Sequence, residues 1–276
     1  MKVNEHSAFM KLDEFLEFLE QNKPERFKPT GQELVVMGLL NKVISNIRAI
    51  RSLIQEHFLE ESIILIRSIY ESCLYLNYFF YQKELVEKYV TVSYAYSLRN
   101  WLFLREAIAV IDPHVVYPVN NSDSNKSIQA IQVSLKKSKY LRKDTLTDEI
   151  LNDPKKIYNK LIKCNDLPSI DNIKKFLMEK ESDIFKSLDV LHTRLYFQAS
   201  ESVHSCFSTI QDFHLCNDIR SQFNFNQIMS SIAYLLYLGV YAPTQLKIVP
   251  FSYEDAKDKI SSIFTASTSY VANNQH

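Results

Sequence analysis

Two pairs of polar side chains, each spaced four residues apart, are the groups in this sequence best suited to chemistry. Arg67 and Glu71 stand within the apolar run SIILIRSIYESCLYLNYFFY, and Ser200 and His204 stand within DVLHTRLYFQASESVHSCF. Residues four apart lie on one face of an α-helix, so the members of each pair can act together. Arginine binds phosphate through paired N–H groups, and histidine titrates near neutral pH. The combination suits phosphodiester chemistry.

Two tyrosines and a second histidine accompany these pairs. Tyr70 directly precedes Glu71, while Tyr196 and His192 stand one and two helical turns before Ser200. Because His192, Tyr196 and Ser200 are spaced four residues apart, they lie on the same face of a predicted helix. We take Tyr70 and Tyr196 as supporting residues of the candidate site.

The four polar residues have two interpretations. In the first they form a structural network, because a large helical bundle needs satisfied polar groups between its helices. In the second they are catalytic: His204 is the general acid and base, Arg67 stabilises the phosphate, and Glu71 orients one of them. Charges set in an apolar helix need partners or a cleft. Both interpretations therefore require Arg67 and Glu71 to face Ser200 and His204 across the core.

The apolar run from Ser62 to Tyr81 is expected to be the central helix of the fold. It has apolar side chains on every side of a helical wheel, which is typical of a helix buried on most of its surface. Three glycines and eight prolines are few for 276 residues and favour long helices joined by short loops. The sequence predicts an all-α multi-helix bundle. Periodic apolar patterns place the other main helices at 9–21, 32–56, 84–111, 170–181, 183–215, 225–241 and 251–264.

We expect one helical domain over residues 1–276, with a peripheral or inserted section at 113–182 and a disordered tail at 266–276. The peripheral section follows a predicted long loop, Asp112 to Lys126. Between Lys126 and Lys180 thirteen Lys and Arg residues stand against seven Asp and Glu residues. This bias indicates either a solvated helical surface or a surface that binds RNA.

Composition excludes several classes of protein. The 32 basic and 32 acidic residues cancel, so the chain as a whole is not attracted to nucleic acid. Three glycines cannot form a phosphate-binding loop, and we expect no cofactor. The His-x-Cys pairs at 204–206 and 214–216 point in different directions on a helix, so no metal site is expected.

The location expected for the chain is the cytoplasm. Four cysteines without a C-x-x-C pair fit a reducing compartment. The most apolar segment, Ile228 to Ala242, is shorter than the roughly 20 residues that a membrane span needs. We therefore expect no contact with a membrane.

A resemblance to known families rests on the same residues. The run NIRAIRSLIQEHFLEESIILIRSIYESCLYLNYFF, followed much later by a tyrosine and SESVH, resembles a mostly bacterial helical family catalogued as a domain of unknown function. That family has an R-x-x-x-E helix, here Arg67 and Glu71, and an S-x-x-x-H helix, here Ser200 and His204. The resemblance covers roughly Leu34 to Leu215. It implies a helical bundle with a common site and no settled activity.

A more distant similarity is to the HEPN superfamily, the helical ribonuclease domains of prokaryotic toxins and antiviral defence. Those proteins usually place an arginine four to six residues before a histidine. Here nine residues separate Arg194 from His204, and Arg67 stands on another helix.

Two classes of function remain open, and with them whether the chain is an enzyme. One is an interaction or accessory component of a bacterial defence or toxin–antitoxin type system, with a protein partner or a second copy of the chain. The other is a metal-independent HEPN-like ribonuclease with a composite site of Arg67, Glu71, Ser200 and His204.

Overall fold

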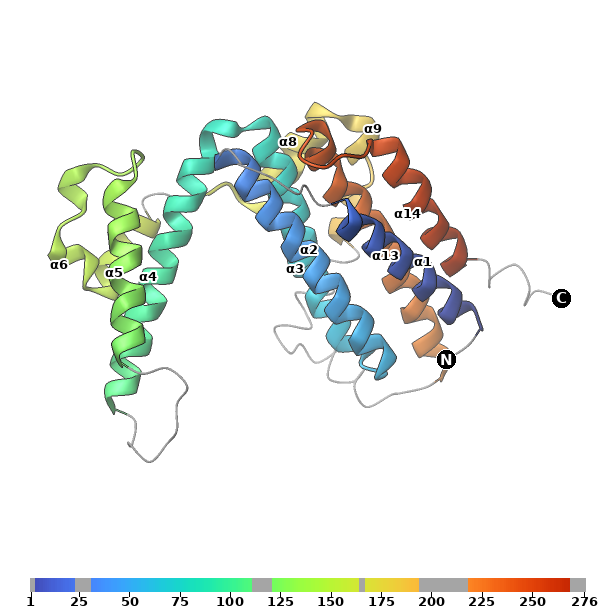
Figure 1. Ribbon diagram of the computed structural model, residues 1–276, viewed down its shortest axis with the longest axis horizontal. Helices are drawn as coiled ribbons and strands as arrows, with labels where there is room; N and C mark the ends of the chain where they lie inside the picture. The colour runs from blue at the N-terminus through green and yellow to red at the C-terminus, as the bar shows by residue number, and fades with distance from the viewer. Residues whose placement is uncertain (1–2, 23–30, 111–120, 164–166, 194–217, 269–276) are drawn as a thin grey trace. The chain divides into compact units, whose positions relative to one another are not determined.

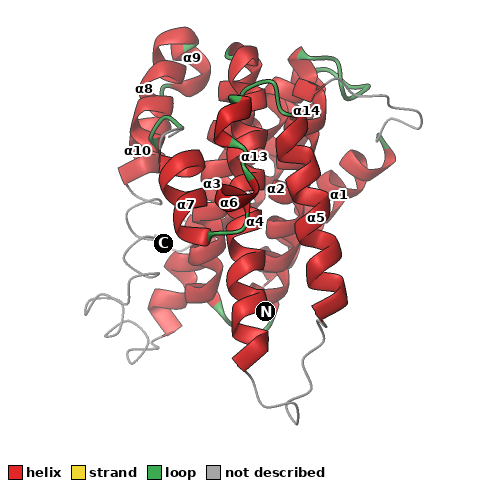
Figure 2. Cartoon of the chain, turned by 90° about the vertical axis from the view of Figure 1, so that its left-hand side faces the viewer, coloured by secondary structure: helices red, strands yellow, loops and turns green. Residues whose placement is uncertain are grey.

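The computed structural model describes residues 3–22, 31–110, 121–163, 167–193 and 218–268. Within these ranges every regular element is a helix and no strand occurs, as the colouring of Figure 2 shows. The predicted all-α bundle is confirmed. The chain divides into two compact units, Met1–Tyr81 with Ser169–His276, and Gln82–Pro168, called unit 1 and unit 2 below.

Unit 1 is a bundle of long helices with short helices at one end (Figure 1). Helices α2 and α3 pack along each other, α13 lies against both, and α14 lies between α13 and α1. The helices of this unit are α1 (Val3–Gln21), α2 (Gly31–Gln55), α3 (Leu59–Tyr81), α8 (Ile170–Lys180), α9 (Ser182–Phe185), α10 (Leu188–Leu191), α13 (Asp218–Gln245) and α14 (Tyr253–Thr268).

Helix α3 supplies many of the most deeply buried side chains of unit 1. Ile66, Ile69 and Phe79 have at most 1% of their surface exposed. The carbonyl of Phe79 at the end of the helix accepts a hydrogen bond of 2.7 Å from Nε2 of Gln32 on α2. Because the last carbonyls of a helix have no partner within it, this bond ties the end of α3 to α2.

Polar side chains also join α3 to α13. Nδ2 of Asn77 donates to the carbonyl oxygens of Cys73 on its own helix and Leu238 on α13, each at 2.8 Å. Sγ of Cys73 donates to the carbonyl of Leu235 at 3.3 Å. Burial raises the pKa of the Cys73 thiol, so this free cysteine stays protonated and unreactive at neutral pH.

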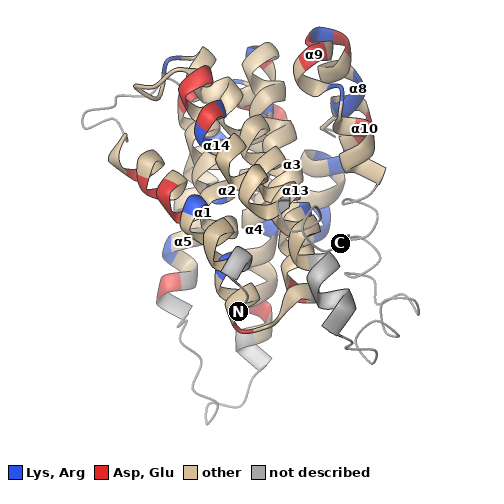
Figure 3. Cartoon of the chain, turned by 90° about the vertical axis from the view of Figure 1, so that its right-hand side faces the viewer, with Lys and Arg blue, Asp and Glu red and all other residues tan. Residues whose placement is uncertain are grey.

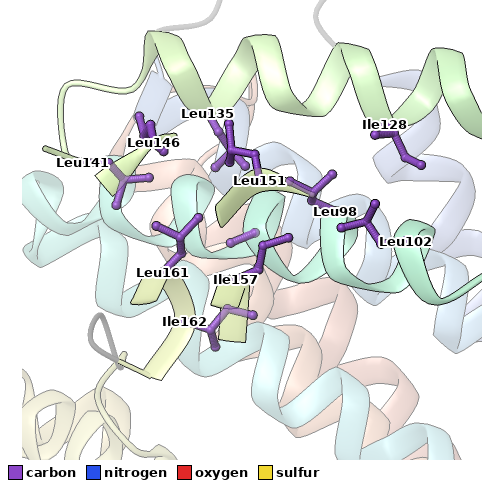
Figure 4. Close-up of a cluster of buried hydrophobic side chains, with 11 residues drawn as sticks. Leu98, Leu102, Ile128, Leu135, Leu141, Leu146, Leu151, Ile157, Leu161 and Ile162 are labelled. Atoms are coloured by element: carbon purple, nitrogen blue, oxygen red, sulfur yellow. The ribbon is translucent and has the colours of Figure 1, made fainter. Parts of the chain in front are cut away.

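Unit 2 has a hydrophobic core of its own. Leu98 and Leu102 of α4 and Leu135 of α5 point into it, together with Leu151 and Ile157 from the short helices (Figure 4). Its elements are η1 (Lys83–Leu85), α4 (Val86–Val110), α5 (Asn121–Lys137), η2 (Lys143–Thr145), α6 (Asp148–Leu151), α7 (Pro154–Ile157) and the π-helical η3 (Tyr158–Ile162).

Part of the predicted loop at 112–126 is wrong. Helix α5 begins at Asn121, so the segment Asn121 to Lys126 is helical. The Asn, Ser and Asp residues that suggested a loop are also the residues preferred at the start of a helix, where they satisfy or attract its first N–H groups. Residues 111–120 lie outside the described part.

The continuous helix predicted from Asp183 is also wrong at its start. Helices α9 and α10 are separated by a turn at Lys186 and Ser187, where Ser187 has φ −89° and ψ 3°. That conformation lies in the bridge region between helix and strand. Ser187 and Asp189 have low helix propensity, because their side chains compete for backbone hydrogen bonds. The predicted course of this helix from 194 to 215 falls outside the described residues.

The remaining boundaries differ by a few residues. Helix α13 continues past Gly239 and includes Pro243, and α14 extends to Thr268. The predicted capping pair of α14 is present: the amide of Asp255 donates to Oγ of Ser252 at 3.1 Å, and the amide of Ser252 donates to the Asp255 carboxylate at 3.1 Å. None of the described helices is long and apolar enough to cross a membrane. The single domain, the section 113–182 and the tail 266–276 stay predictions.

Candidate functional site

Arg67 and Glu71 form the ion pair that their spacing predicts. Nε of Arg67 donates to Oε1 of Glu71 at 3.0 Å, and the two side chains are 27% and 34% exposed. They stand on a partly exposed stripe of α3, one turn after Ile64, which is 37% exposed. Ion pairs in contact with water contribute little stability, roughly 0–1 kcal/mol. The pair is therefore open to solvent and is a weak structural element.

Tyr70, in the same turn of α3, is turned toward the core and not toward solvent. Its side chain is fully buried, and its phenolic oxygen is 3.2 Å from Nδ1 of His192, which directly follows α10. His192 is itself 4% exposed. His192 precedes Ser200 and His204 in the chain. It contacts α3 at Tyr70, which stands between Arg67 and Glu71 in the sequence.

His192 also contacts α8. Its Nε2 is 3.1 Å from Oδ1 of Asp171, and nearby Nζ of Lys174 donates to Oδ1 of Asp189 at 2.7 Å. Helix α8 is therefore tied to α10 by one ion pair and, through His192, to α3 by hydrogen bonds. Figure 3 shows the charged positions of both signs along α8 and α10. We call Tyr70, His192, Asp171, Lys174 and Asp189 the histidine cluster.

The partners of His192 fit a neutral imidazole. We assign the tautomer from them: Nε2–H donates to the Asp171 carboxylate, and Nδ1 accepts from the hydroxyl of Tyr70. Burial lowers the pKa of His192 below 6.5 and the positive charge of Lys174 adds to this, against the smaller opposite effects of Asp171 and Asp189. The histidine is uncharged at neutral pH.

Acid is expected to destabilise the protein through His192. The pKa of His192 is lowered in the folded chain, so below pH 6.5 the unfolded chain binds a proton that the folded chain does not. The contribution is complete above pH 6.5 and is lost as the pH falls from there through the lowered pKa of the folded state. Chemical unfolding between pH 7.5 and pH 5 measures it.

The variant His192→Gln is the control for this titration. It lacks the imidazole, so its stability is expected to fall less than that of the wild type over the same pH range. Asp171, Asp189, Lys174 and Tyr70, which surround His192, remain in both proteins. The pKa of Asp189 is lowered from 3.8, mainly by its hydrogen bond from Lys174, so this carboxylate titrates in a more acidic range. Parallel pH curves for the two proteins would contradict the assignment.

The structure brings together part of the predicted site. Arg67 and Glu71 are paired, and Tyr70, taken as a supporting residue, contacts His192. Tyr196, Ser200 and His204 lie outside the described residues, so their position opposite α3 stays a prediction. Asp171 and Lys174 had no signal in the sequence, since they stand on a short amphipathic helix where charges are the rule.

The histidine cluster can fix how its helices pack and can lower the pKa of His192. Burial keeps Tyr70 and His192 from reacting with a substrate. A fully buried phenol and a 4% exposed imidazole do not reach a substrate in solution. The polar groups in contact with solvent are the carboxylates of Asp171 and Asp189 and, to a smaller extent, the charges of Arg67 and Glu71. Among the described residues no group of three or more His, Cys, Asp or Glu side chains is placed to hold a metal ion.

Fold and site together define an all-helical protein whose central helix carries an R-x-x-x-E pair beside a buried histidine. The chain belongs to a family of unknown function, DUF5677, whose sequence profile matches residues 33–222, more than half of its length. This confirms the resemblance to a helical family of unknown function. Searches of curated proteins and of solved structures find no match.

Proposed function

We propose that this chain is an interaction or accessory component of a bacterial defence or toxin–antitoxin type system, and that its histidine cluster is structural. The observation that supports this is the buried His192, which has a partner on each ring nitrogen and joins α3 to α8. A satisfied polar network of this kind fixes how helices pack. The bacterial setting and the type of system are proposed from the sequence resemblance alone.

The local charge at Arg67 supports the same role. The Glu71 carboxylate is 3.0 Å from Nε of Arg67 and part of its surface is exposed. A negative charge beside the guanidinium repels a phosphate and lowers the benefit of placing one there. Such a pair suits a contact with a protein partner or a second copy of the chain better than it suits a phosphodiester.

The alternative function is a metal-independent ribonuclease that uses Arg67, Glu71, Ser200 and His204. One observation favours it: the ion pair is part exposed, although the helix around it is apolar. An arginine kept at a solvent-accessible position can bind an anion when a substrate arrives. In this function His204 would exchange the proton, and Glu71 would orient one of its neighbours.

Incubation with total RNA in the presence of EDTA tests the two functions. We expect wild type, Arg67→Ala and His204→Ala to leave the RNA equally intact over hours. Circular dichroism checks that both variants are folded. Cleavage by the wild type that both variants lose would establish the ribonuclease and overturn the proposal.

Expression in bacteria provides the second readout. We expect no growth defect from the wild type produced alone, because an accessory component needs its partner. A growth defect that His204→Ala abolishes while the protein stays folded would instead support the enzyme. His192→Gln is the matched histidine control, since it alters a histidine outside the proposed catalytic set.

A further inference from the structure

Exposed aromatic side chains are concentrated in unit 2. Among the described residues, seven aromatic side chains are at least 36% exposed, and five of them belong to this unit, which is less than a third of the chain. An exposed aromatic ring keeps a large apolar surface in contact with water, so a group of them marks a binding surface. The five are Tyr94, Tyr96, Phe103, Tyr140 and Tyr158.

Three of these rings surround or adjoin one arginine. The guanidinium carbon of Arg99 on α4 is 5.1 Å from the ring centre of Phe103 and 5.2 Å from that of Tyr158 on η3. Tyr96 stands two turns before Phe103 on the same face of α4. Leu98 and Leu102 point the other way, into the core of unit 2 (Figure 4). Because these two leucines bury one side of α4, the side that carries Tyr96 and Phe103 faces solvent.

Arg99 differs from several other arginines in its neighbours. Arg48, Arg51, Arg67 and Arg142 each pair with a carboxylate. Within the described ranges Arg99 has no carboxylate partner, and its guanidinium lies over the two rings. Its positive charge is therefore not neutralised locally. A cation held between aromatic rings, without a counter-ion, is arranged to meet an anion.

The net charge of unit 2, to which this face belongs, is also positive. Residues 82–168 contain fourteen Lys and Arg against ten Asp and Glu, whereas the rest of the chain has eighteen against twenty-two. Lys155 and Lys160, both exposed, stand on either side of Tyr158 in the chain. Glu149 and Asp153, two acidic residues that precede Tyr158 in the chain, both form ion pairs with Lys156. An excess of positive charge attracts a polyanion.

We propose that the face formed by Tyr96, Arg99, Phe103 and Tyr158 binds single-stranded RNA. Unpaired bases stack on exposed aromatic rings and on guanidinium planes, and the phosphates contact arginine and lysine. A duplex hides its bases within the stack and cannot use the rings. This inference deepens the proposed interaction role by giving a partner class, and it concerns a surface separate from Arg67 and the histidine cluster.

Fluorescence anisotropy of a fluorescein-labelled 20-nucleotide poly(U) RNA, with the full chain, tests the proposal. We expect Phe103→Ala and Tyr158→Ala each to weaken binding roughly tenfold, the order of one lost stacking contact. Arg99→Lys keeps the charge but loses the planar group, so it should weaken binding by several fold.

Phe264→Ala is the matched control, because Phe264 is 49% exposed but stands on α14 of unit 1. It should bind the RNA like the wild type. All four variants alter side chains that are at least partly exposed, and thermal melting checks that they fold. The proposal is overturned if poly(U) does not bind, if the ring variants bind it like the wild type, or if a duplex RNA or polyglutamate binds equally well.

The outcome is separate from that of the proposed function. Cleavage of RNA would be seen as loss of intact strand and would depend on Arg67 and His204, whereas binding depends on Phe103 and Tyr158. A chain that cuts RNA but binds poly(U) through the rings would overturn the first proposal and support the second. A chain that does neither would overturn only the second.

Discussion

Replacing Tyr70 by alanine is expected to lower the free energy of unfolding by about 3–5 kcal/mol, the usual range for removing a large buried aromatic side chain. Among the side chains that the structure describes, Tyr70 is the largest that is fully buried, and it is also the hydrogen-bond partner of His192. The substitution leaves a cavity in the core beside α3. It also removes the hydroxyl that donates a hydrogen bond to Nδ1 of His192. Equilibrium unfolding in urea at pH 7.5 measures the change.

Tyr70→Phe separates the hydrogen bond from the packing. It keeps the ring and removes the hydroxyl, so a loss of roughly 1–3 kcal/mol is expected, as for other buried groups that lose a partner. Tyr75→Ala is the control on the same helix, since Tyr75 is only part buried, and about 1 kcal/mol is expected for it. If Tyr70→Phe were as stable as the wild type, His192 would not depend on this hydroxyl.

The sequence predicted the local parts of the site better than the distant ones. The pairing of Arg67 with Glu71 follows from helical spacing alone, and it is present. The burial of Tyr70 follows from its apolar neighbours on α3. The contact between Tyr70 and His192 joins residues 122 positions apart. No periodicity reports such a contact, because it depends on how α3, α8 and α10 pack.

The exposure of Arg67 and Glu71 shows how an all-round apolar pattern can mislead. The run from Ser62 to Tyr81 predicts burial on most sides, and most of α3 is buried. A narrow stripe nevertheless stays in contact with solvent, and the two charges lie on it. A few polar residues in an apolar run therefore indicate the exposed stripe of the helix as much as a buried pair.

The aromatic face of unit 2 combines residues from two stretches that stand far apart in the sequence. The basic section from Lys126 to Lys180 contains Tyr158. The residues Tyr96, Arg99 and Phe103 stand earlier in the chain, on α4. Helix α4 and the segment α7 to η3 pack on each other only in the folded unit. The cation and its two rings come together through that packing, which neither segment reveals by itself.

The second large effect is expected from Asn77→Asp, which should lower the free energy of unfolding by about 3–5 kcal/mol at neutral pH, as an uncompensated buried charge does. Asn77 is 1% exposed, and its Nδ2 donates to the carbonyl of Cys73 on α3 and to that of Leu238 on α13. An aspartate would bring a negative charge against both carbonyls. Asn77→Ala removes the donor without adding a charge, so roughly 1–3 kcal/mol is expected for it.

The pH dependence distinguishes the charge from the lost hydrogen bonds. Burial raises the pKa of an aspartate at position 77 above its unfolded value of about 3.9, so the folded variant binds a proton more tightly than the unfolded one. By linkage, its stability is greatest in acid and falls as the pH rises from about 3.9 through the raised pKa. The gap between Asn77→Asp and Asn77→Ala should therefore shrink from pH 7.5 to pH 5. A gap that does not change with pH would mean that the carboxylate reaches solvent, and that α3 and α13 are less tightly joined at Asn77 than their hydrogen bonds indicate.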